Sequence, residues 1–433
     1  MEEKKVILRE LLLKHPADIA EVLSSLSDIQ AVDLLHRLYL RQAAAEPLGE
    51  MEPEESAELL AELDPKEAIK ILSRMDPDDA VDLLEELPES GQQEILSHLE
   101  RQEAKVLSDL LAYPPDTAGG LMSPEVVALS LDMSVQEGID LLRQRVEEAE
   151  TIYYAYAVDD DGCLQGVLSL RDMALAQPWT RLSALLQPDA ITVPVEADAE
   201  DVAHLFDKYN YYALPVVDRQ QKLLGIITID DVIDVIRDEA TEDIYGMASV
   251  PMNEGVDTTW LASLRMRLPW LYVRLATALL AAVVVGIFEG MIAKVAALAV
   301  LMGVIAGQGG SAGMQTVTII TRGMALGDLE TQEGLRLLGK EAVLGLVNGL
   351  LIGMTVGVIT YVWKGEIQLG VAACLAMLLN MVAAGISGVA IPLGLRKLGK
   401  DPAIASGIFL TTVTDVLGFV FLFVLAKIFL PEI

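Results

Sequence analysis

Asp415 is the residue with the clearest potential for chemistry, because it is a carboxylate about halfway along an apolar segment, in the run Thr-Thr-Val-Thr-Asp. A carboxylate at mid-bilayer costs roughly 2.5–3.5 kcal/mol, so it should face water or a partner. Thr411 lies one helical turn before it and Gly407 one turn before that, so the three share a helix face. No basic residue is expected at a comparable depth, which disfavours a structural ion pair. This small and polar face, with Thr414 beside it, predicts a pore wall.

A hard divalent cation suits such a wall. Mg²⁺ keeps several of its waters in protein sites and is typically held by one or two carboxylates. Hydroxyls and backbone carbonyls could contact the retained water shell. In a symmetric dimer with the pore on its axis, two copies of Asp415 would match the charge of the ion. These properties predict Mg²⁺ as substrate and a homodimer.

A second group of acids precedes the apolar segments, with six acidic residues within thirteen positions of an expected helix: Asp231, Asp234, Asp238, Glu239, Glu242 and Asp243. Residues 231, 234, 238 and 242 share one helix face, where like charges destabilise one another unless a cation lies between them. Such a run is usually a solvated face. Its position directly before the membrane part also makes it a candidate control element.

Five apolar segments are expected to position Asp415 as membrane-spanning helices: 269–288, 295–321, 342–363, 367–395 and 402–430. The three central segments carry no charge, and each exceeds the roughly 20 residues needed to cross the hydrocarbon core. The sequence therefore predicts an α-helical transmembrane domain with five spans, bounded by the lipid bilayer.

Glycines recur in two of these segments. Gly345, Gly349, Gly353 and Gly357 form a stripe along one face of the third span, which is typical of close helix packing. The second span contains Gly-Gln-Gly-Gly-Ser-Ala-Gly-Met-Gln over 307–315. For this run, packing and a position beside the pore are equally favoured.

The basic residues flanking the spans indicate their orientation. Nine lie on one side and three, Lys294, Lys364 and Lys427, on the other, and the richer side is cytoplasmic. Arg274, one of the nine, is expected to reach the interface from inside the first span. The N-terminal run lacks the apolar region of a signal peptide. We therefore expect a multi-pass protein of the cytoplasmic membrane, with the N-terminus and soluble domains cytoplasmic and the C-terminus outside.

The net charge is concentrated before the spans. Residues 1–264 carry 19 basic and 55 acidic side chains, whereas residues 265–433 carry 12 and 9. A surface this acidic repels phosphate, which excludes nucleic acid as a partner. An enzyme is also disfavoured, since no nucleophile with a base is evident and all four histidines lie in helical stretches of the soluble half.

Residues 1–118 contain a 12-residue repeat, in which 64–75 and 76–87 both begin with Asp-Pro. Asp as N-cap followed by Pro in the first turn is a strong helix-start signal, and related starts occur near Pro16, Pro53 and Pro88. The repeat predicts an all-α superhelical N-domain. Taken singly, most of its acids are expected to be caps or solvated residues.

A longer repeat follows. Gly-Val-Leu-Ser-Leu-Arg-Asp (166–172) matches Gly-Ile-Ile-Thr-Ile-Asp-Asp (225–231) at an offset of 59 residues. The two β-turn-β-helix units closely resemble a tandem pair of CBS domains, over 119–178 and 179–238, a regulatory module that often binds adenosine nucleotides. The resemblance implies that Asp172 and Asp231 hold ribose and that Ser169 and Thr228 face phosphate. A pair that binds no ligand is an equally favoured alternative.

The domain order resembles that of the MgtE family of magnesium channels: an acidic helical N-domain (1–118), a CBS pair, an acidic connecting helix (239–264) and a transmembrane domain (265–433). The most specific shared parts are the glycine- and glutamine-rich run at 307–315, Asp-Pro-Ala-Ile-Ala-Ser from Asp401, and the run ending in Asp415. The resemblance implies a homodimer with hydrated Mg²⁺ near Asp415. It also implies that the connecting helix acts as a plug, which cytosolic Mg²⁺ locks by bridging acidic faces.

The resemblance also implies two sets of binding residues. The regulatory Mg²⁺ set is Asp231, Asp234, Glu239, Glu242, Asp243, Asp401 and Glu200, to which we add Asp76 and Asp79 of the acidic repeat. The ATP set is Tyr154, Arg171 and Asp172, with Tyr211 as a stacking partner. The function expected is Mg²⁺ uptake through a channel closed by cytosolic Mg²⁺, with ATP as a candidate modulator. A proton-coupled transporter of divalent cations, with Asp415 as its relay, is the alternative.

Overall fold

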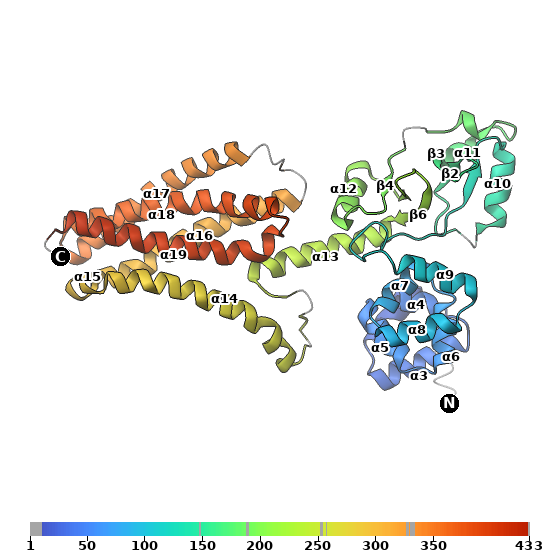
Figure 1. Cartoon of the computed structure of the whole chain (residues 1–433), viewed down its shortest axis with the longest axis horizontal. Coiled ribbons are helices and arrows are strands. Elements are labelled where there is room, and N and C mark those ends of the chain that lie inside the picture. The colour runs from blue at the N-terminus through green and yellow to red at the C-terminus, as the bar shows by residue number, and fades with distance from the viewer. Residues whose placement is uncertain are drawn as a thin grey trace. The chain divides into compact units, whose positions relative to one another are not determined.

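The computed structural model describes residues 11–146, 149–187, 190–251, 254–256, 258–325, 329 and 334–431 (Figure 1). It divides into two compact units, 1–236 and 237–433. We describe each unit by itself. The first contains the helical N-domain and two small β-sheets, and the second contains the long apolar helices.

The N-domain consists of short helices: α2 (Pro16–Ser24), α3 (Asp28–Tyr39), α4 (Ala45–Gly49), α5 (Pro53–Ala61), α6 (Pro65–Leu72), α7 (Pro77–Glu85), α8 (Glu89–His98) and α9 (Arg101–Leu110). The starts of α2, α5, α6 and α7 have Pro in the first turn. At α6, the Asp64 side chain accepts a hydrogen bond from the Lys66 amide at 2.9 Å. The helix starts expected from the repeat are confirmed, and leucines on the inner faces form the core.

Two three-stranded sheets follow, built from β1 (Ala128–Ser130), β2 (Tyr154–Val158) and β3 (Leu164–Ser169), and from β4 (Val193–Pro194), β5 (Ala213–Val217) and β6 (Leu223–Thr228). In each sheet the first strand is parallel to the second, and the second is antiparallel to the third. Tyr154 pairs with Ser169 and Ala213 with Thr228, so the register repeats at the 59-residue offset of the sequence. The tandem CBS fold is confirmed.

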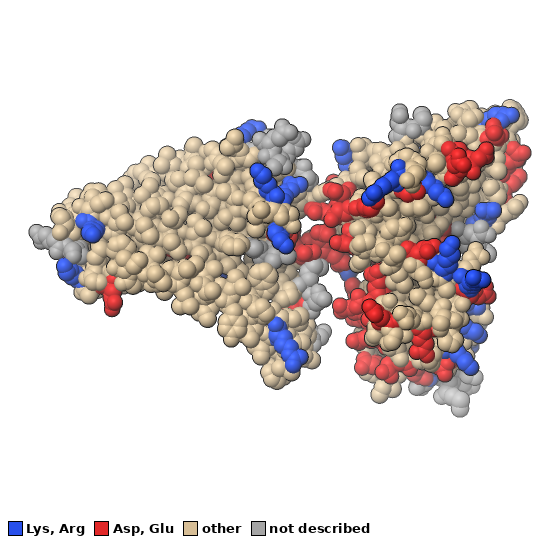
Figure 2. Space-filling model, viewed as in Figure 1, with Lys and Arg blue, Asp and Glu red and all other residues tan. Residues whose placement is uncertain are grey.

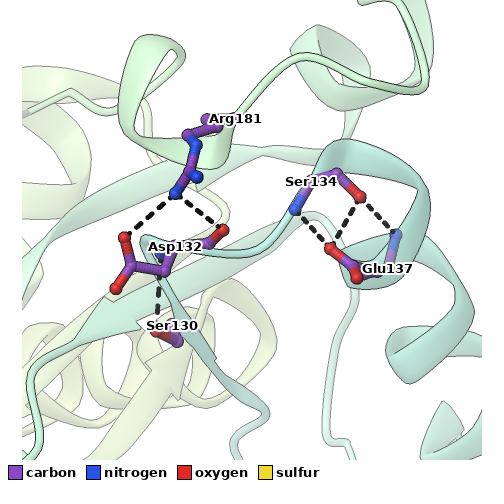
Figure 3. Close-up of polar contacts among 5 residues, drawn as sticks. All are labelled: Ser130, Asp132, Ser134, Glu137 and Arg181. Atoms are coloured by element: carbon purple, nitrogen blue, oxygen red, sulfur yellow. Dashed lines mark hydrogen bonds and ion pairs between the residues drawn. The ribbon is translucent and has the colours of Figure 1, made fainter.

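The first sheet is accompanied by α10 (Val135–Gln144), α11 (Leu170–Leu175) and the short 3₁₀ turn Leu182–Ala184, whose Leu182 joins the core of this sheet although it follows residue 178. The second sheet is accompanied by α12 (Ala199–Tyr209). Figure 3 shows how α10 begins. The Ser134 amide donates to Glu137 Oε2 at 2.8 Å, and the Glu137 amide donates to Ser134 Oγ at 3.3 Å. Beside this capping box, Arg181 donates to Asp132 Oδ1 at 3.2 Å. These bonds fix the returning chain against the start of α10.

The acidic connecting helix differs from the expected 239–264. It is α13, which spans Ile229–Ala248, starts directly after β6 and contains all six acids of the run. Ser249 has a φ of 57° and Pro251 follows it, and both features end a helix. The next helix begins only at Trp260.

Within its described residues, the second compact unit contains five helices long and apolar enough to cross a membrane, which confirms the five expected spans. They are α14 (Trp260–Ile287), α16 (Ala297–Ala325), α17 (Gly334–Lys364), α18 (Ile367–Lys397) and α19 (Pro402–Phe429), with the short α15 (Glu289–Lys294) between the first two. The first helix starts before the expected residue 269 because Pro269 is accommodated inside it. Helices α16 to α19 lie side by side (Figure 1).

The glycine stripe of α17 packs on α18. A Cβ at Gly345 would lie 2.6 Å from the Met381 carbonyl oxygen, and one at Gly353 would lie 2.7 Å from that of Cys374. Because backbone atoms cannot yield to a side chain, only glycine permits this separation of the helices. The packing interpretation of the stripe is confirmed.

The glycines of α16 divide between the two expected roles. Gly309 packs against Asn380 and Gly313 against Leu410. Gly307 and Gly310 instead line a cavity. The helix remains continuous through the whole run.

Candidate functional site: a carboxylate cavity and an acidic cluster

A cavity of about 800 Å³ lies among α14, α16 and α19. Asp415 of α19 is the only acidic residue among the described residues that line it, and it is partly buried. Polar groups from two helices surround it, since Ser311 and Gln315 come from α16 and Thr411 from α19. The wall thus combines one negative charge with hydroxyl and amide groups.

The hydroxyl groups of this wall are oriented by their own helices. Thr411 donates to the Gly407 carbonyl at 3.0 Å, and Ser311 donates to the Gly307 carbonyl at 2.9 Å. Since each hydroxyl hydrogen is used by the backbone, the oxygen keeps lone pairs that can accept hydrogen bonds. Such oxygens suit the water shell of a hydrated cation.

Two of the four pore residues expected from sequence lie outside the lining. Thr414 is fully buried and donates to the Leu410 carbonyl at 3.0 Å. At Gly407 a Cβ would lie 3.2 Å from Met314 and 3.3 Å from the Met247 carbonyl oxygen of α13. Thr412, which sequence reasoning mentioned only as a neighbour of Asp415, does line the cavity.

Arg274 of α14 lines the same cavity. Its guanidinium exerts an attractive electrostatic effect on the Asp415 carboxylate, although the two side chains form no direct ion pair. Sequence reasoning did not place a basic residue in the cavity of this carboxylate. The packing of the first span against the last brings the cation there, and sequence spacing does not reveal it.

A second site lies in the first compact unit, where carboxylates from separate elements meet. Ligand oxygens of Asp76, Glu125 and Glu150 all lie within 4.8 Å of one another. Asp76 is the N-cap of α7, whereas Glu125 and Glu150 lie in loops of the first CBS unit. Ser123 donates to Glu150 at 3.1 Å. The structure thus adds two carboxylates that sequence reasoning missed.

The acids of α7 crowd this cluster. Asp78 is 8% exposed, and its Oδ1 has no hydrogen-bond partner among the described residues. Burial, followed by the charges of Asp231 and Glu150, raises the pKa of Asp78 well above its ordinary value. Burial likewise raises the pKa of Asp79, Asp82 and Glu150 to about 7.

Asp231 connects this cluster to the start of α13. Burial raises its pKa to about 6, while a hydrogen bond from Thr228 Oγ1 at 2.7 Å opposes the shift. The same bond occupies the carboxylate that the CBS resemblance assigned to ribose. In the first CBS unit Ser169 makes no side-chain cap to α11, so the two units differ at this position.

The remaining expected regulatory residues fall in other places. In the second compact unit, burial and then the Asp401 carboxylate raise the pKa of both Glu242 and Asp243. Asp401 caps α19 by accepting from the Ala403 amide at 2.7 Å. Glu200 lies on α12, where its Oε1 is 3.9 Å from Nε2 of His204. The other two, Asp234 and Glu239, lie on α13.

Figure 2 shows acidic side chains spread over the first compact unit and along α13. On the same face, the long apolar helices carry charged side chains mainly near their ends. On this face, the acidic side chains therefore gather mainly over the first compact unit and α13.

Aromatic residues gather where the expected nucleotide set lies. Tyr153 stacks on Tyr212 at 5.2 Å between ring centroids, and Tyr209 on Tyr211 at 5.7 Å. Burial raises the pKa of Tyr154, which the Tyr212 backbone and the Tyr211 ring approach. The rest of the set begins α11, where Arg171 is exposed and Asp172 partly buried.

Three family models match the chain. They are described as "Divalent cation transporter" over residues 302–425, "MgtE intracellular N domain" over 14–116, and "CBS domain" over 118–178 and 182–238. Similar proteins include the magnesium transporter MgtE of Enterococcus faecalis, 37% identical over 76% of this chain and 72% of that protein. The MgtE of Thermus thermophilus is 36% identical over 79% of this chain and 75% of that protein.

The first compact unit also resembles a solved structure. The crystal structure of the cytosolic domain of the Mg²⁺ channel MgtE in complex with ATP matches with a TM-score of 0.51 and 37% identity. The match covers 54% of this chain and 94% of that one.

Proposed function

The chain belongs to the MgtE family of magnesium transporters, and we propose that it is a Mg²⁺-selective channel for uptake across the cytoplasmic membrane. The observation that carries the proposal is the cavity in which Asp415 is the single acidic lining residue among those described. The relatives are named as magnesium transporters, which is a transport family and not an enzyme family.

In this proposal Mg²⁺ crosses with much of its water shell. Mg²⁺ dehydrates reluctantly, and the cavity offers one carboxylate surrounded by hydroxyl and amide groups rather than a closed cage of ligands. Two chains related by a two-fold axis would place two Asp415 carboxylates at the ion. The homodimer thus supplies the charge that one chain lacks.

The proposed orientation follows from the flanking charges. Nine Lys and Arg residues mark one side and three mark the other, so the soluble domains and the N-terminus are cytoplasmic and the C-terminus is outside. The acidic cluster then samples the Mg²⁺ concentration of the cytoplasm.

We infer that cytosolic Mg²⁺ closes the channel by binding among these acids. The donor set fits a hard cation, because carboxylate oxygens are its preferred ligands and the buried Oδ1 of Asp78 lacks a partner among the described residues. Without cations, mutual repulsion favours separation of the acidic elements; with cations, the repulsion is offset. The proposed regulatory residues are Asp76, Asp79, Asp231, Asp234, Glu239, Glu242, Asp243, Asp401 and Glu200.

ATP is a proposed modulator of this regulation. The matching cytosolic domain carries ATP in its solved structure, and the residues that the family resemblance assigns to ATP in this chain are Tyr154, Arg171, Asp172 and Tyr211. A tyrosine ring can stack on a base and Asp172 can accept from ribose hydroxyls.

Uptake of Mg²⁺ into proteoliposomes at imposed voltage tests the pore. Asp415→Asn and Asp415→Ala should abolish uptake, whereas Glu366→Gln, which neutralises an exposed carboxylate before α18, should leave it unchanged. Uptake that is indifferent to Asp415 would mean that the pore lies elsewhere.

The same assay separates the channel from the alternative of a proton-coupled transporter. Channel uptake follows voltage and persists when the proton gradient is collapsed. Uptake that stops with the proton gradient would identify Asp415 as a proton relay instead.

A further inference from the structure

Arg274 places a permanent positive charge in the cavity of Asp415. It is the only basic residue among the described residues that line this cavity, and a guanidinium stays protonated in proteins. Arg274 is the fifteenth residue of α14 and Asp415 the fourteenth of α19. These two helices pack together and are the first and fifth spans, so they run in the same direction. The first and the last span thus each contribute one charged side chain to the same cavity.

The cation faces the carboxylate without being neutralised by it. The guanidinium attracts the Asp415 carboxylate, yet neither side chain forms an ion pair or a hydrogen bond with another described side chain. An ion pair with Arg274 would neutralise Asp415, which is the only acidic side chain among the described lining residues. Because no such ion pair forms, the carboxylate can bind an entering ion.

We propose that Arg274 is a specificity-determining residue, a tethered cation that competes for Asp415 and so excludes monovalent cations from the pore. The proposal rests on the proposed channel function. It assigns to the first span a role in selecting ions by their charge.

The physical basis is the charge of the competing ions. An entering K⁺ carries the same single charge as the guanidinium, so exchanging one for the other gains little electrostatic energy. Mg²⁺ carries twice that charge, and its attraction to the carboxylate is correspondingly larger at equal distance. Charged side chains that line a pore are an established means of selection.

A different role for Arg274 is anchorage of α14, because arginines inside spans often extend to lipid headgroups. The two roles give different results. Anchorage affects the amount of folded protein in the membrane, whereas competition for Asp415 changes which ions cross and at what concentration.

The test compares Arg274→Gln, Arg274→Lys and the control Arg265→Gln, which removes the same charge from α14 outside the lining. Each variant is reconstituted full length, and flux is normalised to the folded protein recovered. Mg²⁺ uptake is measured over a range of concentrations, and K⁺ flux is measured without Mg²⁺.

We expect Arg274→Gln to conduct K⁺ and to lower the half-saturating Mg²⁺ concentration about tenfold. Arg274→Lys and Arg265→Gln should resemble wild type in both measurements. If Arg274→Gln remains impermeable to K⁺ with an unchanged Mg²⁺ dependence, the inference is wrong, and reduced recovery alone would assign Arg274 to anchorage.

Failure of this inference is distinguishable from failure of the channel proposal. Loss of uptake in Asp415→Asn together with wild-type selectivity in Arg274→Gln would overturn only the role of Arg274. Full uptake in Asp415→Asn would overturn the proposed pore, and with it the inference.

Discussion

At the scale of single residues, folding changes the protonation of several carboxylates around α7. Burial raises the pKa of Asp79 from 3.8 to about 7, and that of Glu150 from 4.5 to about 7. The folded protein therefore binds these protons more tightly than the unfolded chain does. Their contribution to stability is fully present below the unfolded pKa values and is lost as the pH rises through about 7.

The first prediction is a pH dependence of stability that Mg²⁺ removes. Without divalent cations, the full-length protein in detergent should unfold at a lower temperature at about pH 8 than at about pH 6, because the raised carboxyl groups ionise between them. Mg²⁺ should restore the unfolding temperature at the higher pH and have little effect at about pH 5, where protons occupy the same groups. Thermal unfolding followed by intrinsic fluorescence measures both effects.

Asp79→Asn tests the same cluster without changing the shape of the side chain. At about pH 8 in the absence of Mg²⁺, it should stabilise the protein by at least about 1 kcal/mol, because it removes a carboxylate whose pKa is raised in the folded protein by more than one unit. The stabilising effect of Mg²⁺ should shrink in this variant. Glu58→Gln, which neutralises an exposed acid of α5, is the control; an equal effect of both changes would contradict the prediction.

At the scale of elements, the contact between α17 and α18 depends on the absence of side chains. Gly353→Ala should destabilise the membrane unit, because its Cβ would meet the Cys374 carbonyl at 2.7 Å. Gly339→Ala on the same helix has no atom within 4 Å of the new Cβ and should be neutral or slightly stabilising, by up to about 1 kcal/mol. Thermal stability in detergent, followed by size-exclusion chromatography, distinguishes the two; equal stability of both variants would show that the helices can separate freely.

The sequence predicts elements best where the signal is local. Asp-Pro pairs gave the starts of α6 and α7, and the 59-residue offset predicted which strand pairs would correspond. The end of α13 was missed because it depends on the positive φ of Ser249. Serine adopts a positive φ far less readily than glycine does, so the composition of the segment does not predict that the helix ends there.

Sites that need distant elements were predicted only in part. Asp415 was evident because a carboxylate in an apolar run is conspicuous by itself. Glu125 and Glu150 were missed, since they lie in loops and only the tertiary fold brings them to Asp76. The position of Arg274 in the cavity lining was missed for a similar reason, because it depends on the packing of α14 against α19.

At the scale of the whole molecule, the charge distribution predicts how cations change its compactness. Residues 1–264 carry 55 acidic and 19 basic side chains, so unbalanced repulsion should loosen this part when divalent cations are removed. Limited proteolysis of the full-length protein should therefore cleave it faster in chelator than in millimolar Mg²⁺. K⁺ at matched ionic strength controls for screening, and identical cleavage in all three conditions would contradict cation bridging.

The two CBS sheets share their register and a bulge at the same point of the central strand, which is the mark of an internal duplication. The copies differ clearly in the helix that follows the last strand. After the first, α11 ends at Leu175; after the second, α13 continues to Ala248 without a loop. The helix at this position is six residues long in the first copy and 20 residues long in the second, where its length is about 30 Å. Because no loop separates β6 from α13, any ligand that displaced β6 would also displace the first turn of this helix.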